Sequence, residues 1–156
     1  MKKPNIKTIS ELKNSGYLPI SIKDELFKNL SSKLESGKET FPLVFGYENT
    51  VIPELERAIL SKHNINFLGL RGQAKTRLAR MMVNLLDDWV PIIKGSEIND
   101  DPLKPISHFG KNIILEKGDS TEIDWIYKSE RFFEKLATPD VTVSDPITFD
   151  SYHVKL

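Results

Sequence analysis

One stretch decides the fold that this sequence predicts: Asn66-Phe67-Leu68-Gly69-Leu70-Arg71-Gly72-Gln73-Ala74-Lys75-Thr76-Arg77-Leu78. Its centre, Gly69-x-x-x-x-Ala74-Lys75-Thr76, follows the phosphate-binding loop pattern G-x-x-x-x-G-K-[ST], with alanine where the last glycine is expected. The apolar run at residues 65–68 is typical of a short buried strand. Behind the loop, apolar side chains recur at helical spacing, at Leu78, Met81, Met82, Leu85 and Leu86. A strand, a tight loop and a helix in this order predict an anion site where the helix begins.

Each residue type in the loop has a chemical reason. Gly69 and Gly72 let the backbone turn tightly, and the N–H groups of Gln73 and Ala74 extend the run of donors. Lys75 would place its ammonium group against the β- and γ-phosphates of ATP. The Thr76 hydroxyl would bind Mg²⁺, which prefers oxygen ligands. We expect the loop to accept the methyl group of Ala74 only if φ is negative there. The alternative is a glycine-rich turn that arose by chance.

The composition bounds the class of protein. A chain of 156 residues indicates one domain with a core of its own. Basic and acidic residues number 22 each, and this zero net charge argues against direct nucleic-acid binding. The absence of cysteine excludes a disulfide framework and a thiolate metal site. The sequence shows no signal peptide and no apolar run of membrane-spanning length, so we expect a cytoplasmic protein without membrane partners.

Caps, spacing and breakers predict the remaining elements. Thr8-x-x-Glu11 and Ser21-x-x-Asp24 fit capping boxes and open two helices within residues 1–40. This N-terminal helical segment is either an arm that docks on a neighbouring subunit or partner, or a helical pair that packs on its own domain. Further helices are predicted around Pro53, at residues 106–116 and at residues 129–136, and strands at residues 89–93 and 122–127.

Other chemistry has weaker support in the sequence. Glu97, Asp100 and Asp101 could bind a metal, but a solvated loop is the interpretation that their pattern favours. ATP hydrolysis needs an apolar strand that ends in an acidic pair. Residues 112–116 have a helical pattern, and residues 141–145 end in a single aspartate before Pro146. No catalytic residue is therefore assigned.

Several segments together resemble a known family. The chain is similar to the AAA+ ATPases related to the magnesium chelatase ATPase subunit and to MoxR, among them bacterial sigma-factor-interacting-type regulators. The segments are Phe45-Gly46-Tyr47-Glu48-Asn49-Thr50-Val51-Ile52-Pro53, Ala58-Ile59-Leu60-Ser61-Lys62-His63-Asn64-Ile65, residues 68–77, residues 95–102 and residues 134–143. The resemblance runs from about Thr8 to Val143 and includes the alanine at position 74.

The resemblance implies an α/β fold and a nucleotide site. Residues 41–143 would form part of an αβα P-loop sandwich around a parallel sheet, followed by a divergent tail at residues 144–156. Phe45 and Gly46 would lie near the adenine, and residues 72–76 would hold the phosphates and Mg²⁺. Relatives of this kind assemble as rings of complete subunits, with an arginine supplied by the neighbour. They remodel partner proteins, for example one with a metal-dependent adhesion-type domain.

The sequence leaves the family pattern near Ser144, before the acidic strand, the arginine finger and the lid. We therefore expect a truncated, N-terminal portion of the module that binds ATP and Mg²⁺, with hydrolysis left open. Two alternatives remain at this point. One is a non-catalytic fragment that acts only through interaction with complete subunits. The other is a fragment of a transcription-regulator-type ATPase, for which the sequence offers no basic stripe.

Overall fold

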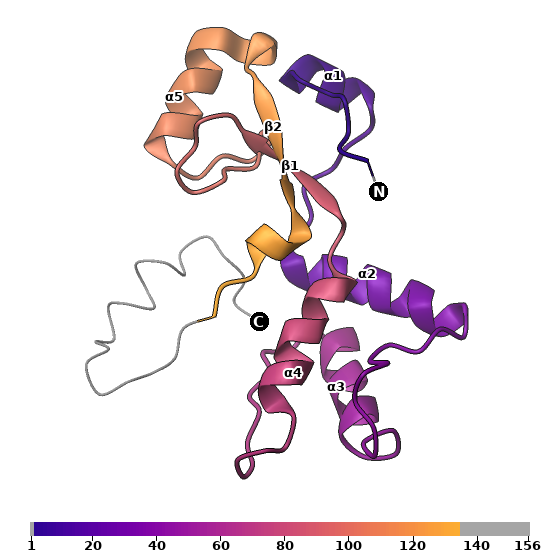
Figure 1. Cartoon of the computed structure of the whole chain (residues 1–156). Helices are drawn as coiled ribbons and strands as arrows, with labels where there is room; N and C mark the ends of the chain where they lie inside the picture. Colours follow the sequence, from indigo (N-terminus) through magenta and orange to yellow (C-terminus); the bar gives the residue numbers. More distant parts are fainter. Residues whose placement is uncertain (1, 135–156) are drawn as a thin grey trace, which may run out of the picture. The chain divides into compact units, whose positions relative to one another are not determined.

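The computed structural model describes residues 2–134 (Figure 1). Within them the chain forms two compact units. The hairpin unit comprises residues 2–19 and 88–131, and the helical unit comprises residues 20–87 and 132–134. The elements in chain order are α1 (Ile9–Asn14), α2 (Ile22–Glu35), α3 (Val51–Leu60), α4 (Lys75–Met81), the 3-10 helix η1 (Met82–Leu85), β1 (Trp89–Ile93), α5 (His108–Lys117), η2 (Gly118–Ser120), β2 (Ile123–Tyr127) and η3 (Lys128–Arg131).

The hairpin unit is named for the antiparallel pair β1 and β2, which are joined by a long connection that contains α5. Trp89 lies opposite Tyr127 and Ile93 lies opposite Ile123. Hydrogen bonds from Lys94 N to the Glu122 carbonyl and from Lys128 N to the Asp88 carbonyl bracket the pair. Because such bonds alternate along an antiparallel ladder, the backbone N of Pro91 faces away from β2. A proline therefore costs this edge strand no ladder bond.

The N-terminal segment covers the other edge of β2. Ile123 N donates to the Lys7 carbonyl at 2.9 Å, and Ile9 N donates to the Thr121 carbonyl at 3.1 Å. These bonds seat α1 so that Ile9 and Leu12 are buried with Ile123. Thr8 accepts the backbone N–H of Glu11, as its capping box predicts, so the N-terminal helix is confirmed within this unit.

A buried carboxylate organises the connection between β1 and α5. Asp100 is only 4% exposed. Its Oδ1 accepts the backbone N–H groups of Ile106 at 2.7 Å and Ser107 at 2.9 Å, and its Oδ2 accepts the hydroxyls of Ser96 and Ser107. Ser107 in turn caps α5 by accepting Gly110 N. The expectation of a solvated acidic loop is therefore wrong for Asp100, which is a structural acceptor.

The helical unit packs the apolar faces of α2, α3 and α4 with η1. Its core is formed by Leu26, Leu30, Phe41, Val44, Leu55, Ile59, Leu78, Met81, Met82, Leu85 and Leu86. The helix expected after the phosphate loop is confirmed, and its apolar stripe is buried as predicted, although its last turn tightens into η1. The helix capped by Ser21 and the helix around Pro53 are also confirmed.

The expected parallel-sheet P-loop sandwich is wrong for this structure. The sheet in residues 2–134 has two strands, and they are antiparallel. Residues 65–68 form no strand, and the Leu68 side chain is 85% exposed instead of buried. The physical reason is that a four-residue segment needs flanking strands to satisfy its backbone, whereas β1 and β2 pair with each other.

Two further predictions concern the C-terminal end of the described part of the chain and the residues after it. The helix predicted at residues 129–136 is represented by the short η3, without a helix at residues 132–134. Residues 135–136, the segment 141–145 and the predicted tail 144–156 lie outside the described residues.

The boundary predicted near residue 40 falls inside the helical unit, and α1 and α2 belong to different units.

Candidate phosphate-binding loop

The loop of residues 69–76 lies at the start of α4 in the helical unit. Three of its residues have positive φ: Gly69 at 150°, Gly72 at 81° and Ala74 at 54°. The expectation that φ is negative at Ala74 is therefore wrong. Ala74 takes the left-handed conformation that favours glycine, as the motif has at this position, and accepts a backbone cost of about 1–2 kcal/mol for its methyl group.

Lys75 closes the loop upon itself. Its Nζ donates to the Gly69 carbonyl at 2.9 Å and to the Leu70 carbonyl at 2.5 Å. These carbonyls lie five and six residues earlier in the chain, so the ammonium group bridges the two ends of the loop. An ammonium group has three donors, and one remains for a further acceptor. The loop thus places a positive charge beside its own backbone, at the start of a helix.

The start of α4 has no side-chain cap. The first N–H groups of a helix have no intrahelical partner, and together with the helix dipole they favour an anion. Leu78 N donates back to the Ala74 carbonyl at 2.9 Å and marks the first helical bond. The N–H groups of Lys75, Thr76 and Arg77 precede that bond. Together with the Lys75 ammonium group, they form the donor set that phosphate binding requires.

The two glycines of the loop are needed for different reasons. Gly69 is required for space as well as for its φ, because a Cβ there would collide with the Gln73 side chain. A Cβ at Gly72 would meet open space, so glycine is favoured there by φ alone. Gln73 therefore contributes its side chain to the shape of the loop, a contact that the sequence pattern does not specify.

Phe45 and Gly46, the predicted adenine contacts, lie on the segment that precedes α3. Phe41 and Val44 anchor this segment in the core, whereas Phe45 is 76% exposed. Gly46 N donates to the Glu48 carboxylate at 2.9 Å. The backbone N–H of Glu48 itself and that of Gly46 lower the pKa of the Glu48 carboxyl group.

One contact that the sequence did not predict joins this segment to α4. Arg77 Nη1 donates to the Leu43 carbonyl at 3.1 Å. The spacing of 34 residues makes it a tertiary contact. An arginine two residues after the motif lysine could have been noticed, but nothing in a sequence points to a carbonyl as its partner.

The Thr76 hydroxyl could bind Mg²⁺ only together with phosphate oxygens and water. Within residues 2–134 no group of three His, Cys, Asp or Glu side chains is placed to hold a metal ion. Thr76 is exposed in the first turn of α4 beside Lys75. Since Mg²⁺ commonly keeps several waters and takes one or two protein ligands with substrate phosphates, one hydroxyl is compatible with it when phosphate is bound.

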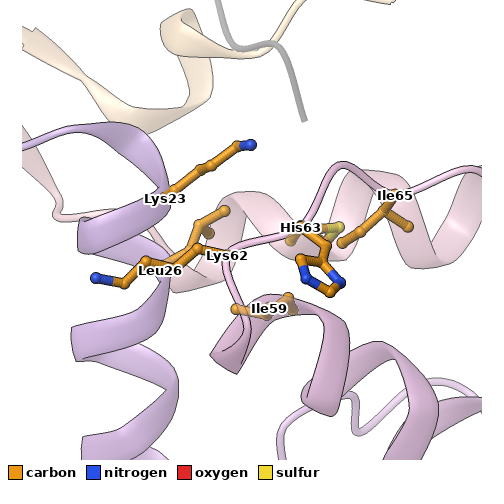
Figure 2. A pocket seen from close by; sticks show the side chains of 7 residues that line it. Lys23, Leu26, Ile59, Lys62, His63 and Ile65 are labelled. Carbon is orange, nitrogen blue, oxygen red and sulfur yellow. The ribbon is translucent and has the colours of Figure 1, made fainter.

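Other hollows of the described residues are poorer sites. In the helical unit, a cavity of about 10 Å³ is lined by Lys23, Leu26, Ile59, Lys62, His63, Ile65 and Met82 (Figure 2). That volume holds one water at most. In the hairpin unit, an open groove of about 700 Å³ is lined by charges that pair with each other, Lys3 with Asp124 and Lys94 with Glu122.

None of the helices in residues 2–134 combines the length and the apolar character that crossing a membrane requires. Compared with protein-family models, with curated proteins and with solved structures, the chain matches none.

Proposed function

We propose that the loop of residues 69–76 binds the phosphate groups of a nucleoside triphosphate, ATP being the expected ligand, together with Mg²⁺. The observation that carries the proposal is the position of Lys75. Its ammonium group bridges the Gly69 and Leu70 carbonyls directly before an uncapped helix start. A lysine held at this point can exchange these carbonyl oxygens for phosphate oxygens.

This exchange is favourable on electrostatic grounds. A hydrogen bond between an ammonium group and a phosphate is charge-assisted and about twice as strong as one between neutral groups. The N–H groups at the start of α4 add donors, and the helix dipole adds roughly 0.3–1 kcal/mol for an exposed anion. Thr76 would share Mg²⁺ with phosphate oxygens and water. Phe45, with an exposed ring, and Gly46 would contact the base.

The proposal concerns binding and does not depend on a parallel sheet. It assigns the chain to the cytoplasm, where a nucleoside triphosphate would be its ligand. Hydrolysis is not assigned, because the sequence offers no convincing apolar strand that ends in an acidic pair. Assembly with complete AAA+ subunits stays a prediction of the sequence resemblance.

Thermal unfolding in the presence of Mg-ATP tests the proposal. Ligand at about 100 times its Kd stabilises the folded chain by roughly 2.7 kcal/mol. For a chain of this size we expect a rise in melting temperature of about 5–10 °C. Lys75→Ala should abolish the rise, because it removes the ammonium group. Lys28→Ala is the matched control, since it removes an equal charge from an exposed position on α2 in the same unit.

The melting-temperature shifts of the wild type, Lys75→Ala and Lys28→Ala distinguish three outcomes. A shift in the wild type that persists in Lys28→Ala and vanishes in Lys75→Ala supports the site. An equal shift in all three proteins would place the nucleotide elsewhere. No shift in a folded wild-type chain would refute binding and favour the alternative of a protein that acts by interaction alone. For that alternative the exposed Leu68 and Leu70 side chains would be the first residues to test.

A further inference from the structure

Two arginines on α4 hold different parts of the helical unit. Arg77 donates to the Leu43 carbonyl at 3.1 Å. Arg80, three residues later, forms a two-pronged pair with the Glu134 carboxylate, at 2.7 and 3.0 Å. Both arginines are exposed, so their difference lies in what they hold. Only Arg77 reaches the segment that carries Phe45 and Gly46.

The Arg77 bond lies at a sensitive position. Leu43 sits between the buried Phe41 and Val44, and Val44 N donates to the Phe41 carbonyl at 3.2 Å. The segment is therefore fixed to the core on both sides of the carbonyl that Arg77 holds. Arg77 itself follows Thr76 directly in the first turn of α4. One hydrogen bond thus connects the phosphate loop with the residues expected at the base.

We propose that Arg77 is a positioning residue that couples the phosphate loop to the base-binding segment of residues 41–46, through its hydrogen bond to the Leu43 carbonyl. The inference rests on the function proposed above. It predicts that Arg77 favours nucleotides over bare polyphosphates, because its guanidinium group is directed to the backbone of the base segment. A direct phosphate ligand would give no such preference for nucleotides.

The measured quantity is the ratio of two affinities. Binding of Mg-ATP and of Mg-tripolyphosphate is determined by calorimetric titration for each variant of the full chain. Mg-tripolyphosphate carries more negative charge than Mg-ATP, so the charge lost in Arg77→Ala would by itself weaken tripolyphosphate more and raise the preference for ATP, opposite to the effect that the proposal predicts. We expect Arg77→Ala to lower the preference for ATP by roughly 3- to 10-fold, since about 1.4 kcal/mol corresponds to tenfold and one exposed hydrogen bond contributes about that or less.

Two variants test the route of the effect. Arg80→Ala removes the same charge and a hydrogen-bonded pair from the same helix, and should not lower the ratio. Phe45→Ala removes the exposed ring and should lower the ratio by itself. The double variant Phe45→Ala with Arg77→Ala should lower it little further, because residues that act through one contact are not additive. Phe45→Ala also keeps the proposal testable if Arg77→Ala does not fold.

Each result decides the proposal. A lower ratio in Arg77→Ala and Phe45→Ala, without a decrease in Arg80→Ala, supports it. An unchanged ratio in Arg77→Ala overturns it, as does a wild type that binds ATP and tripolyphosphate equally well. Fully additive effects in the double variant overturn it too. Failure of the proposed function is distinguishable, because the wild type would then bind neither ligand and Lys75→Ala would behave identically.

Discussion

The Asp100 network allows the most direct test of how the hairpin unit is held together. Asp100→Ala removes the acceptor of two backbone N–H groups and two hydroxyls. The hydroxyls of Ser96 and Ser107 can rotate to other acceptors. The N–H groups of Ile106 and Ser107 are fixed by the backbone and would remain partly buried without a partner.

The magnitude follows from those two N–H groups. An unsatisfied buried donor costs about 1–3 kcal/mol, so we expect Asp100→Ala to lower the free energy of unfolding by roughly 3 kcal/mol. Asp100→Asn keeps the oxygen that faces Ile106 N and Ser107 N, and its amide can donate to the two hydroxyls. We expect about half the loss for this variant.

Urea unfolding followed by tryptophan fluorescence is the assay. The two tryptophans of the chain, Trp89 and Trp125, lie in β1 and β2 and therefore report the hairpin unit. At a slope of about 1–1.5 kcal/mol per molar urea, a loss of 3 kcal/mol moves the midpoint by roughly 2–3 M. Asp119→Ala is the control, because it removes an exposed carboxylate of the same unit whose pair with Lys13 contributes little.

The dependence on pH gives the same test a second readout. Burial raises the pKa of Asp100, but the hydrogen bonds from Ser107, Ile106 and Ser96 outweigh it, and the pKa is lowered overall. A carboxyl group whose pKa is lower in the folded state stabilises the fold above its unfolded pKa of about 3.9, and this contribution is lost as the pH falls further. The stability gap between wild type and Asp100→Asn should therefore be full at about pH 6 and narrow below about pH 4. A midpoint for Asp100→Ala within the scatter of the Asp119→Ala control, or a gap that widens in acid, would refute the reasoning.

Two backbone predictions complete the set. Alanine favours a helix, but Gly110→Ala should destabilise the hairpin unit by about 1–3 kcal/mol in the same fluorescence assay. The reason is that the new Cβ would lie 2.8 Å from Asp100 Oδ2 and 3.0 Å from Pro105 Cβ. A more stable variant would contradict this prediction. Ala74→Gly should leave the helical unit as stable or more stable by circular dichroism, because glycine relieves the left-handed φ of 54°. The control Ala58→Gly, inside α3, should lose about 1 kcal/mol, and equal losses at both positions would show that Ala74 is not strained.

Elements whose signals are local were predictable from the sequence. Thr8 and Ser21 accept the N–H groups three residues later, as their capping boxes require. The strand at residues 89–93 has the bounds that its apolar run predicted, and β2 begins one residue after its predicted start. In each case the signal and the structure it specifies lie within a few residues of each other.

Elements that depend on distant partners were not predictable. An apolar run of four residues is compatible with a buried strand, but its neighbours decide its structure, and residues 65–68 have no strand beside them in the described part of the chain. Asp100 differs from its prediction in the opposite direction, because it was expected to be exposed and is buried. A cluster of three acidic residues favours solvent, yet the N–H groups that satisfy Asp100 come from Ile106 and Ser107, on a turn whose shape the sequence does not reveal.

The phosphate loop depends on local contacts on one side and on the Lys75 bridge on the other, and this difference sets the cost of binding phosphate. On the helix side the loop is held by the buried Leu78 and by the bond from Leu78 N to the Ala74 carbonyl. On the other side Leu68 and Leu70 are exposed, so the Lys75 ammonium group is what orders residues 69–70. Phosphate that draws Lys75 away must replace this bridge with its own contacts to the loop. Each backbone residue left to be ordered costs about 1–2 kcal/mol, and about 1.4 kcal/mol is a factor of ten in affinity. Contacts of the base with the segment at residues 41–46 would offset part of that cost, because the buried Phe41 and Val44 and the bond from Arg77 hold this segment before any ligand arrives.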